Sequence, residues 1–207
     1  MVITPIAHGL TLAAPAPGYV RSPGLHMSQL YGSLFAGLEP ERFGGKEGPD
    51  PLRLELGLAL EEGLEQSLKD RFKAQRPGEF TTEEGIIFTP DGLMFRDEGM
   101  RLVEIKLTWM SSADMPRTTA SSFPSKFDKW VCQMQCYCVK LDTPLARLVA
   151  YFVNGPGSFT KKLGPELLAW DITFTARELK TAWTMVTNNA KHVGLLDSRG
   201  RPIPSAT

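Results

Sequence analysis

The segment that most restricts the fold of this chain is the run RLVEIKLTW at residues 101–109. Apolar and polar side chains alternate along it, as is typical of a β-strand with one face in a core. One face carries three apolar side chains: Val103, Ile105 and Leu107. Glu104 and Lys106 share the other face, so a carboxylate and an ammonium group project together from one side of a predicted sheet.

The pattern around this strand predicts one α/β unit with extensions at both ends. Helices are predicted at 52–73, 125–141 and 176–190, and strands at 85–88, 93–97, 145–155 and 167–175. A short helix capped by Ser28 is expected before them, and a mobile loop at 110–125. The expected divisions are an N-terminal arm with the short helix at 1–51, a domain at 52–192 and a tail at 193–207.

Composition restricts the class of protein less than this pattern does. Lys plus Arg and Asp plus Glu number 23 each, so net charge gives no sign of a nucleic-acid partner. It does not exclude DNA, because a DNA-binding protein needs positive charge only along its groove. No apolar run reaches the roughly 18 residues of a membrane span, and no signal peptide is expected. Three clustered cysteines indicate a reducing, cytoplasmic compartment rather than a disulfide framework: Cys132, Cys136 and Cys138.

A second carboxylate lies upstream of the strand, in the turn signal formed by Pro90, Asp91 and Gly92. A hairpin through the predicted strand that follows could bring Asp91 beside Glu104. Two carboxylates suit Mg²⁺, which binds carboxylate and phosphate oxygens. Lys106 could then orient or deprotonate a water molecule, or neutralise the transition state. The alternative is an ordinary exposed strand face with a surface ion pair.

The predicted helix at 52–73 places a third carboxylate on an apolar stripe. The stripe consists of Leu54, Leu58, Leu64, Leu68 and Phe72. Glu61 falls near the middle of this stripe, whereas Glu62 falls toward the polar side. A carboxylate on a buried face is costly unless it is paired or bound to metal, so Glu61 is a candidate site residue. The alternatives are a pair with a buried Arg or Lys, or a helix rotated so that Glu61 lies at the edge.

Gln133 and Tyr137 are four residues apart on the predicted helix at 125–141, and are therefore neighbours on one helix face. An apolar stripe adjoins them, formed by Phe127, Trp130, Val131, Met134 and Cys138. In isolation this pair fits a helix at the edge of the core, where Tyr137 packs and Gln133 makes a surface contact.

In chain order these motifs resemble the PD-(D/E)XK nuclease superfamily over about residues 52–155. Residues 90–91 resemble the PD motif, and residues 104–106 resemble the EXK motif. Residues 133–137 resemble the QxxxY motif of the RecB-like exonuclease branch. The run LGLALEEGLEQSL at 56–68 resembles a helix that supplies an extra Glu in the RecB-like and lambda-exonuclease-like branches. The sequence also looks like phage-encoded members of this superfamily.

This resemblance implies a restriction-endonuclease-like core, with a central mixed β-sheet flanked by helices. It implies a deoxyribonuclease that uses Mg²⁺, with Mn²⁺ as a substitute, and four metal ligands: Glu61 (directly or through water), Asp91, Glu104 and the backbone carbonyl of Ile105. Lys106 would serve the attacking water. Gln133 and Tyr137 would position that lysine or a DNA phosphate.

Basic and aromatic residues around the 110–125 loop are candidates for DNA binding: Trp109, Arg117, Lys126 and Lys129. The alternative is a solvated loop with Trp130 in the core. His26 could contact DNA or metal, although a lone histidine is more often a surface or capping residue. The clustered cysteines do not match the four thiolates of an iron–sulfur site, so no such cluster is expected.

The expected function is an exonuclease acting on DNA in phage or bacterial recombination and repair, in the bacterial host cytoplasm if the chain is phage-encoded. A single-strand annealing protein or a recombinase is a candidate partner, no membrane is involved, and an oligomer is compatible with the resemblance. Two alternatives stay open. One is a structure-selective endonuclease, and the other is a non-catalytic DNA-binding or recombinase-partner subunit with a nuclease-like fold.

Overall fold

A central sheet of six strands organises the computed structural model, which describes residues 1–6, 22–44, 55–57, 59–60, 63, 69, 73–157 and 164–204. The strands are β1 (Val2–Ile6), β2 (Ala74–Gln75), β5 (Gly92–Arg96), β6 (Gly99–Thr108), β7 (Leu145–Phe152) and β8 (Glu166–Thr173). Their order is β1-β8-β7-β6-β5-β2, and all neighbours are antiparallel except β6 and β7. A separate hairpin pairs β3 (Phe80–Thr81) with β4 (Ile87–Phe88).

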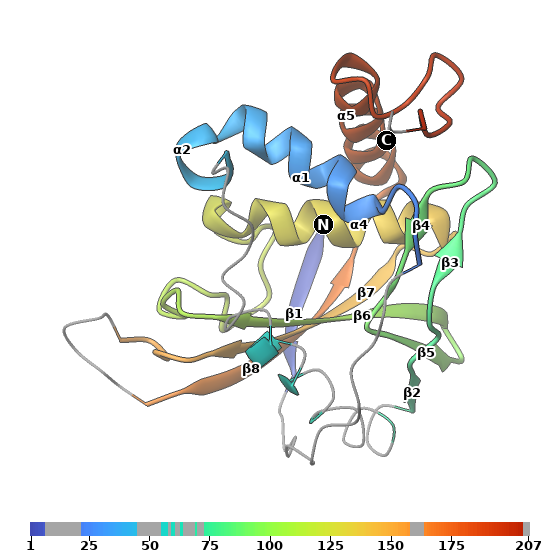
Figure 1. The fold of residues 1–207 in the computed structure, drawn as a ribbon. Coiled ribbons are helices and arrows are strands. Elements are labelled where there is room, and N and C mark those ends of the chain that lie inside the picture. Colours follow the sequence, from blue (N-terminus) through green and yellow to red (C-terminus); the bar gives the residue numbers. More distant parts are fainter. Residues whose placement is uncertain are drawn as a thin grey trace.

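Helices cover one face of this sheet. They are α1 (Met27–Leu38), α2 (Pro40–Phe43), α4 (Asp128–Lys140), which follows a 3₁₀ turn η1 (Ser125–Phe127), and α5 (Ala176–His192). The helix α4 lies on the sheet, and α1 and α5 lie over α4 (Figure 1). Because β6 and β7 are parallel, the chain needs a crossover between them, and α4 is part of that connection.

The opposite face of the sheet has a core of its own. Leu60 packs there against Val103 and Ile105, and residues 55–57 and 59–60 around it are helical. The mixed sheet is thus flanked by helical segments on both sides. The predicted α/β fold with a central mixed sheet is confirmed, and it is consistent with a restriction-endonuclease-like core.

The aromatic core lies between the sheet and the helices. Trp170 is fully buried, and its ring meets Phe123 and Phe152 edge-on at 5.4 and 6.5 Å. Its indole N–H donates to the carbonyl of Pro116 at 2.9 Å. Because Met115 and Phe123 are also buried, the 110–125 segment packs against the domain instead of forming the expected mobile loop.

The N-terminal and C-terminal divisions differ from those expected. Residues 2–6 of the expected arm form β1, which pairs with β8, and the α1 residues Met27 and Leu30 are fully buried in the main core. The expected tail folds back after α5, with Leu196 buried and bridged to Pro202. The pairing of β1 with β8 joins segments far apart in the chain, so local sequence patterns do not predict it.

Several element ends are also shifted. The helix α1 begins at Met27 and not after Ser28, because His26 is the N-cap and its backbone N–H donates to the Gln29 side chain at 2.7 Å. The His26 ring bonds to the carbonyl of Ser22 at 2.8 Å, in the segment before the helix. Lys73 has a φ of 54°, so the helix expected at 52–73 does not extend to it. In the described residues, no helix is long and apolar enough to cross a membrane.

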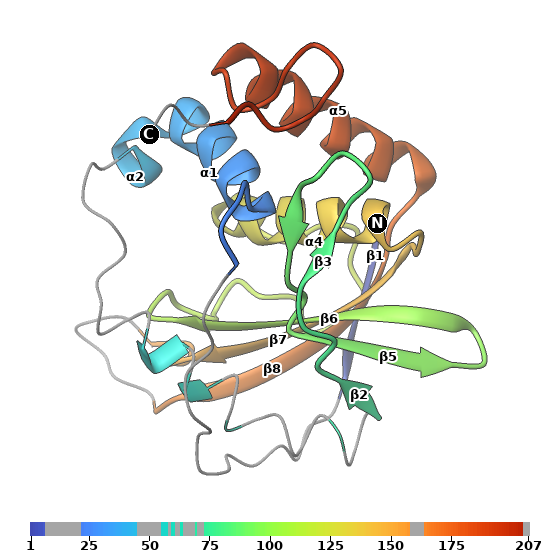
Figure 2. The same ribbon diagram turned by 45° about the vertical axis from the view of Figure 1, so that its right-hand side comes forward.

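The β3–β4 hairpin stands apart from the main sheet beside α4 (Figure 2), and an ion pair ties it to that helix. The Lys140 ammonium donates to the Glu84 carboxylate at 2.6 Å. Burial alone would raise the pKa of Glu84, but hydrogen bonds from Lys140 and Thr82 bring it below its ordinary value of 4.5. The ionised form of Glu84 is therefore favoured by folding.

Glu84→Gln should lower the free energy of unfolding at pH 7 by about 1 kcal/mol or less, since the Glu84 side chain is one-third exposed. A carboxyl whose folded pKa is lowered stabilises the protein above its unfolded pKa, and this contribution is lost as the pH falls through the folded pKa. Urea unfolding at several pH values should show the difference shrinking below pH 4.5. The exposed neighbour Glu83→Gln is the control, and a difference that persists in acid would contradict the account.

Candidate active site

The register of the β5–β6 hairpin places Asp91 beside Glu104. The ladder pairs Gly92 with Val103, so one pair further Asp91 stands opposite Glu104. Residues opposed in an antiparallel pair project to the same face, and the two carboxyl groups are hydrogen-bonding neighbours. The Ile105 backbone N–H donates to Asp91 Oδ2 at 2.6 Å. Two carboxylates therefore converge on the face of the sheet that α4 covers.

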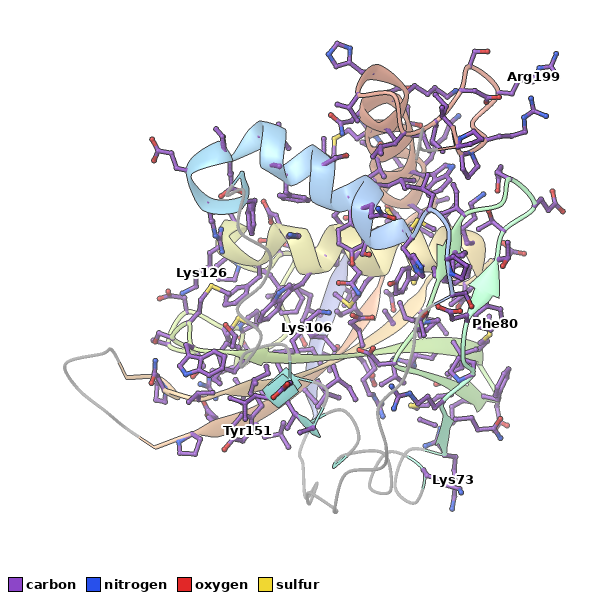
Figure 3. All side chains as sticks on the ribbon, viewed as in Figure 1. Lys73, Phe80, Lys106, Lys126, Tyr151 and Arg199 are labelled. Carbon is purple, nitrogen blue, oxygen red and sulfur yellow. The ribbon has the colours of Figure 1, made fainter. Side chains whose placement is uncertain are left out.

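Glu104 is fully buried and held by two side-chain donors. Its Oε1 atom accepts hydrogen bonds from the Lys106 ammonium and from the Gln133 amide. Lys106 keeps 20% of its side chain exposed and lies between the sheet and α4, whereas Tyr151 lies on the opposite face (Figure 3). The alternation predicted for residues 101–109 therefore places this pair on one face, as expected, but beneath a helix and not in solvent.

A chain of hydrogen bonds continues from Glu104 to two tyrosines. The Tyr137 hydroxyl bonds to Gln133 and to Tyr31 of α1. Burial raises the pKa of both phenols, followed by the charge of Glu104 for Tyr137 and by the charges of Tyr137 and then Glu104 for Tyr31. Both are therefore protonated at neutral pH. Gln133 thus contacts Glu104, the carboxylate to which Lys106 is also bonded.

Pro90 has a physical role next to this site. In the continued β5–β6 register it would pair with Ile105, whose N–H already faces Asp91. A paired strand residue directs its N–H and its carbonyl to the same neighbour. Because proline has no N–H, Pro90 cannot donate the ladder hydrogen bond to the Ile105 carbonyl. That carbonyl is directed toward the Asp91 side of the strand, where a metal ligand was predicted.

The surroundings of Asp91 act on its pKa in opposite directions. Burial raises the pKa of Asp91, while the charges of Lys106 and Arg76 and the Ile105 N–H act in the opposite direction. Two carboxylates and a carbonyl are hard oxygen donors of the kind that bind Mg²⁺ and Mn²⁺. In the described part of the chain, no set of three or more His, Cys, Asp or Glu side chains converges. Glu61, the predicted further ligand, lies outside the described residues.

The four predicted DNA-binding residues fall into different environments. Arg117 is paired with both carboxylate oxygens of Glu166 at 2.6 and 2.8 Å, and Lys126 pairs with Asp114 at 2.8 Å. The Trp109 carbonyl accepts a hydrogen bond from a side chain of the loop after β7. Lys129 lies near enough to the site for the charge of Lys106 to act on its ammonium group.

Two residues near the carboxylates were missed by sequence reasoning, Tyr31 and Arg76. Tyr31 lies among the buried apolar residues of α1, where it reads as a packing residue. Arg76 precedes a proline and a glycine, and that sequence predicts only a chain break. Neither carries a local signal of proximity to Asp91 or Glu104, which are distant in the chain.

The cysteines of α4 are all buried thiols, and burial raises the pKa of Cys138 to about 12.

Tyr31→Phe should test the hydrogen-bond chain that supports Glu104. Losing the hydroxyl leaves Tyr137 without one partner, which should lower the free energy of unfolding by about 1 kcal/mol. Groups that orient metal ligands contribute about 10- to 100-fold, so the nuclease activity expected from the sequence should slow by about tenfold in kcat. Tyr151→Phe, on the other face of the sheet, should change neither quantity. Equal kcat values for Tyr31→Phe and the parent would show that Tyr31 does not help to orient Glu104.

Comparisons with known proteins give no family assignment. No family model and no curated protein matches the chain. The crystal structure of SSO0001 is similar at 17% identity with a TM-score of 0.49, covering 87% of this chain and 80% of that one. A phage-related exonuclease from Haemophilus somnus 129PT is similar at 14% identity with a TM-score of 0.46, covering 80% and 78%. Likenesses at this level do not identify a function, so membership of the PD-(D/E)XK superfamily stays a prediction.

Proposed function

We propose that this protein is a metal-dependent deoxyribonuclease that hydrolyses phosphodiester bonds at Asp91, Glu104 and Lys106. The observation that carries the proposal is the pair of adjoining carboxylates, Asp91 and buried Glu104, with an ammonium group bonded to one of them. Such a pair is costly without a cation. A bound Mg²⁺ would lower the pKa of water and stabilise negative charge on the phosphate.

The residues of the chain would divide the work as follows. Asp91, Glu104 and the Ile105 carbonyl would hold the metal, with Glu61 as a further candidate. Gln133 fixes the orientation of Glu104 through its amide. Lys106 is partly exposed, and its ammonium is bonded to Glu104. From this position the ammonium can also donate to a water or to a phosphate oxygen that enters the site.

Exonuclease action in recombination or repair is the more specific part of the proposal. Incubation of the full chain with linear and with covalently closed circular DNA separates it from endonuclease action. We expect nucleotide release from linear DNA with Mg²⁺ or Mn²⁺, no release with EDTA, and intact circles. Nicked circles would contradict exonuclease action. DNA binding without cleavage in Mg²⁺ and Mn²⁺ would contradict the enzyme and favour a non-catalytic subunit.

A further inference from the structure

Two cations lie against one aromatic ring above the N-terminal end of α4. The Arg42 guanidinium is 4.7 Å from the centre of the Phe43 ring, and the Lys129 ammonium is 4.6 Å from it. Phe43 is itself fixed by an edge-on contact with Phe35 of α1 at 5.8 Å. The ring therefore holds a cation from α2 and a cation from α4 in one place.

The Arg42 side chain is held in position by the chain around it. Its Nη2 atom donates to the Lys126 carbonyl at 2.5 Å, and Nη1 donates to Glu39 at 3.2 Å. The Glu39 side chain is 40% exposed, so water weakens this ion pair. A guanidinium fixed in this way keeps further N–H groups for an anion.

Lys129 has no acidic partner in the residues that the structure describes. Its ammonium is half-buried, and the charges of Lys106 and Arg42 act on it. Burial, followed by these two charges, lowers the pKa of Lys129. The carboxylates of Glu39 and Asp128 act on Arg42. The charges that act on Lys129 are those of two cations, and an anion beside Lys129 would relieve their repulsion.

This cluster lies one helical turn from the residue that contacts the paired carboxylates. Lys129 lies one helical turn before Gln133 on α4, and the Gln133 amide bonds to Glu104. By contrast, the ammonium of nearby Lys126 already pairs with Asp114 at 2.8 Å. The cation without an acidic partner is therefore the one on the helix face that reaches the candidate active site.

We propose that Arg42 and Lys129, held on the Phe43 ring, bind a backbone phosphate of the DNA strand next to the phosphate that is hydrolysed. This subsite rests on the proposed function and specifies its substrate contact. The guanidinium fork suits two phosphate oxygens, and Lys129 adds a point charge. The proposal adds Arg42 and Phe43, which the sequence did not indicate, to the predicted Lys129.

Binding of a fluorescent single-stranded oligonucleotide in EDTA tests this subsite without requiring cleavage. Arg42→Gln and Lys129→Gln should each weaken binding by about tenfold. Each should also reduce the slope of log K against log salt by less than about 0.7, and the double variant by about 0.7, as expected when two cations share one phosphate on a single strand. Lys180→Gln is the matched control and should weaken binding by less than about twofold, because exposed Lys180 lies beside the C-terminal end of α4, away from Lys129. Lys129→Arg should retain the parental affinity.

The outcomes separate this subsite from the nuclease activity. Unchanged affinity and slope in Arg42→Gln and Lys129→Gln would overturn the subsite, whether or not the protein cleaves DNA. Weakened binding in both, with Lys129→Arg near the parent, would support it even if no cleavage is found. Weaker competition by inorganic phosphate against the oligonucleotide in Arg42→Gln than in the parent would support a phosphate contact at this subsite. Thermal melting of Lys129→Arg and Arg42→Gln controls for folding.

Discussion

Glu104→Gln is expected to lower the rate of DNA cleavage by about a thousandfold and to leave the fold intact. The substitution removes a charge that would hold the metal, and metal-ion stabilisation of the transition state contributes several kcal/mol. Each 1.4 kcal/mol or so corresponds to a factor of ten in rate. The amide keeps an oxygen that can accept from Lys106 and Gln133, so the local hydrogen bonds have a near-isosteric replacement.

Single-turnover cleavage in saturating Mg²⁺, with circular dichroism of the same samples, measures this effect. Glu98→Gln is a matched control, because Glu98 lies in the β5–β6 turn and is more than half exposed. It should cleave DNA within about twofold of the parent. A folded Glu104→Gln variant that retains parental activity would contradict a catalytic role for this carboxylate.

Lys106→Met has the second largest expected effect, a loss of about a hundred- to a thousandfold in kcat. The methionine keeps an unbranched apolar side chain but lacks the ammonium that would donate to water or phosphate. Because Asp91 and Glu104 remain, Mn²⁺ binding should be retained. In Glu104→Gln, by contrast, Mn²⁺ affinity should fall by at least 10- to 100-fold.

Calorimetric titration of Mn²⁺ into both variants distinguishes the roles of the two residues. Lys126→Met is the control for loss of a lysine elsewhere on the protein. If Lys106→Met lost Mn²⁺ affinity as severely as Glu104→Gln, the lysine would have to be assigned to building the metal site. Retained Mn²⁺ binding with lost kcat is the pattern that the proposed role requires.

The central part of the site could be predicted from sequence because its signals are local. Alternation along residues 101–109 placed Glu104 and Lys106 on one strand face, and the turn at Asp91 indicated a hairpin beside that strand. Spacing of four on one helix placed Gln133 next to Tyr137. Each inference depends on the geometry of one helix or one hairpin, and in each case the structure brings the named side chains together.

Residues that reach the site from distant segments could not be predicted in this way. Tyr31 reaches Tyr137 only because α1 packs over α4, and Arg42 reaches Lys129 only through the contact of α2 with that helix. Pairing of charges is equally non-local. Lys126 and Arg117 looked available for DNA in the sequence, but the structure pairs both with acids, and Glu166 is 49 residues from Arg117.

The strand β1 illustrates the same limit for the fold. Val2 pairs with Thr173 at the far end of the chain, and Ile3 exchanges backbone hydrogen bonds of 3.1 and 3.2 Å with Ala120. The proline- and glycine-rich sequence that follows β1 favours an extended arm. An edge strand of this kind is stabilised by its partners and has only a weak pattern of its own.

Anomalous diffraction from crystals soaked in Mn²⁺ tests the central claim most directly, because it locates the metal independently of any activity. The account predicts a Mn²⁺ peak in contact with the carboxylates of Asp91 and Glu104 and with the Ile105 carbonyl, and its loss in Glu104→Gln crystals. A saturating soak that leaves the space between these two carboxylates without a peak, or that places Mn²⁺ only elsewhere on the protein, would contradict it.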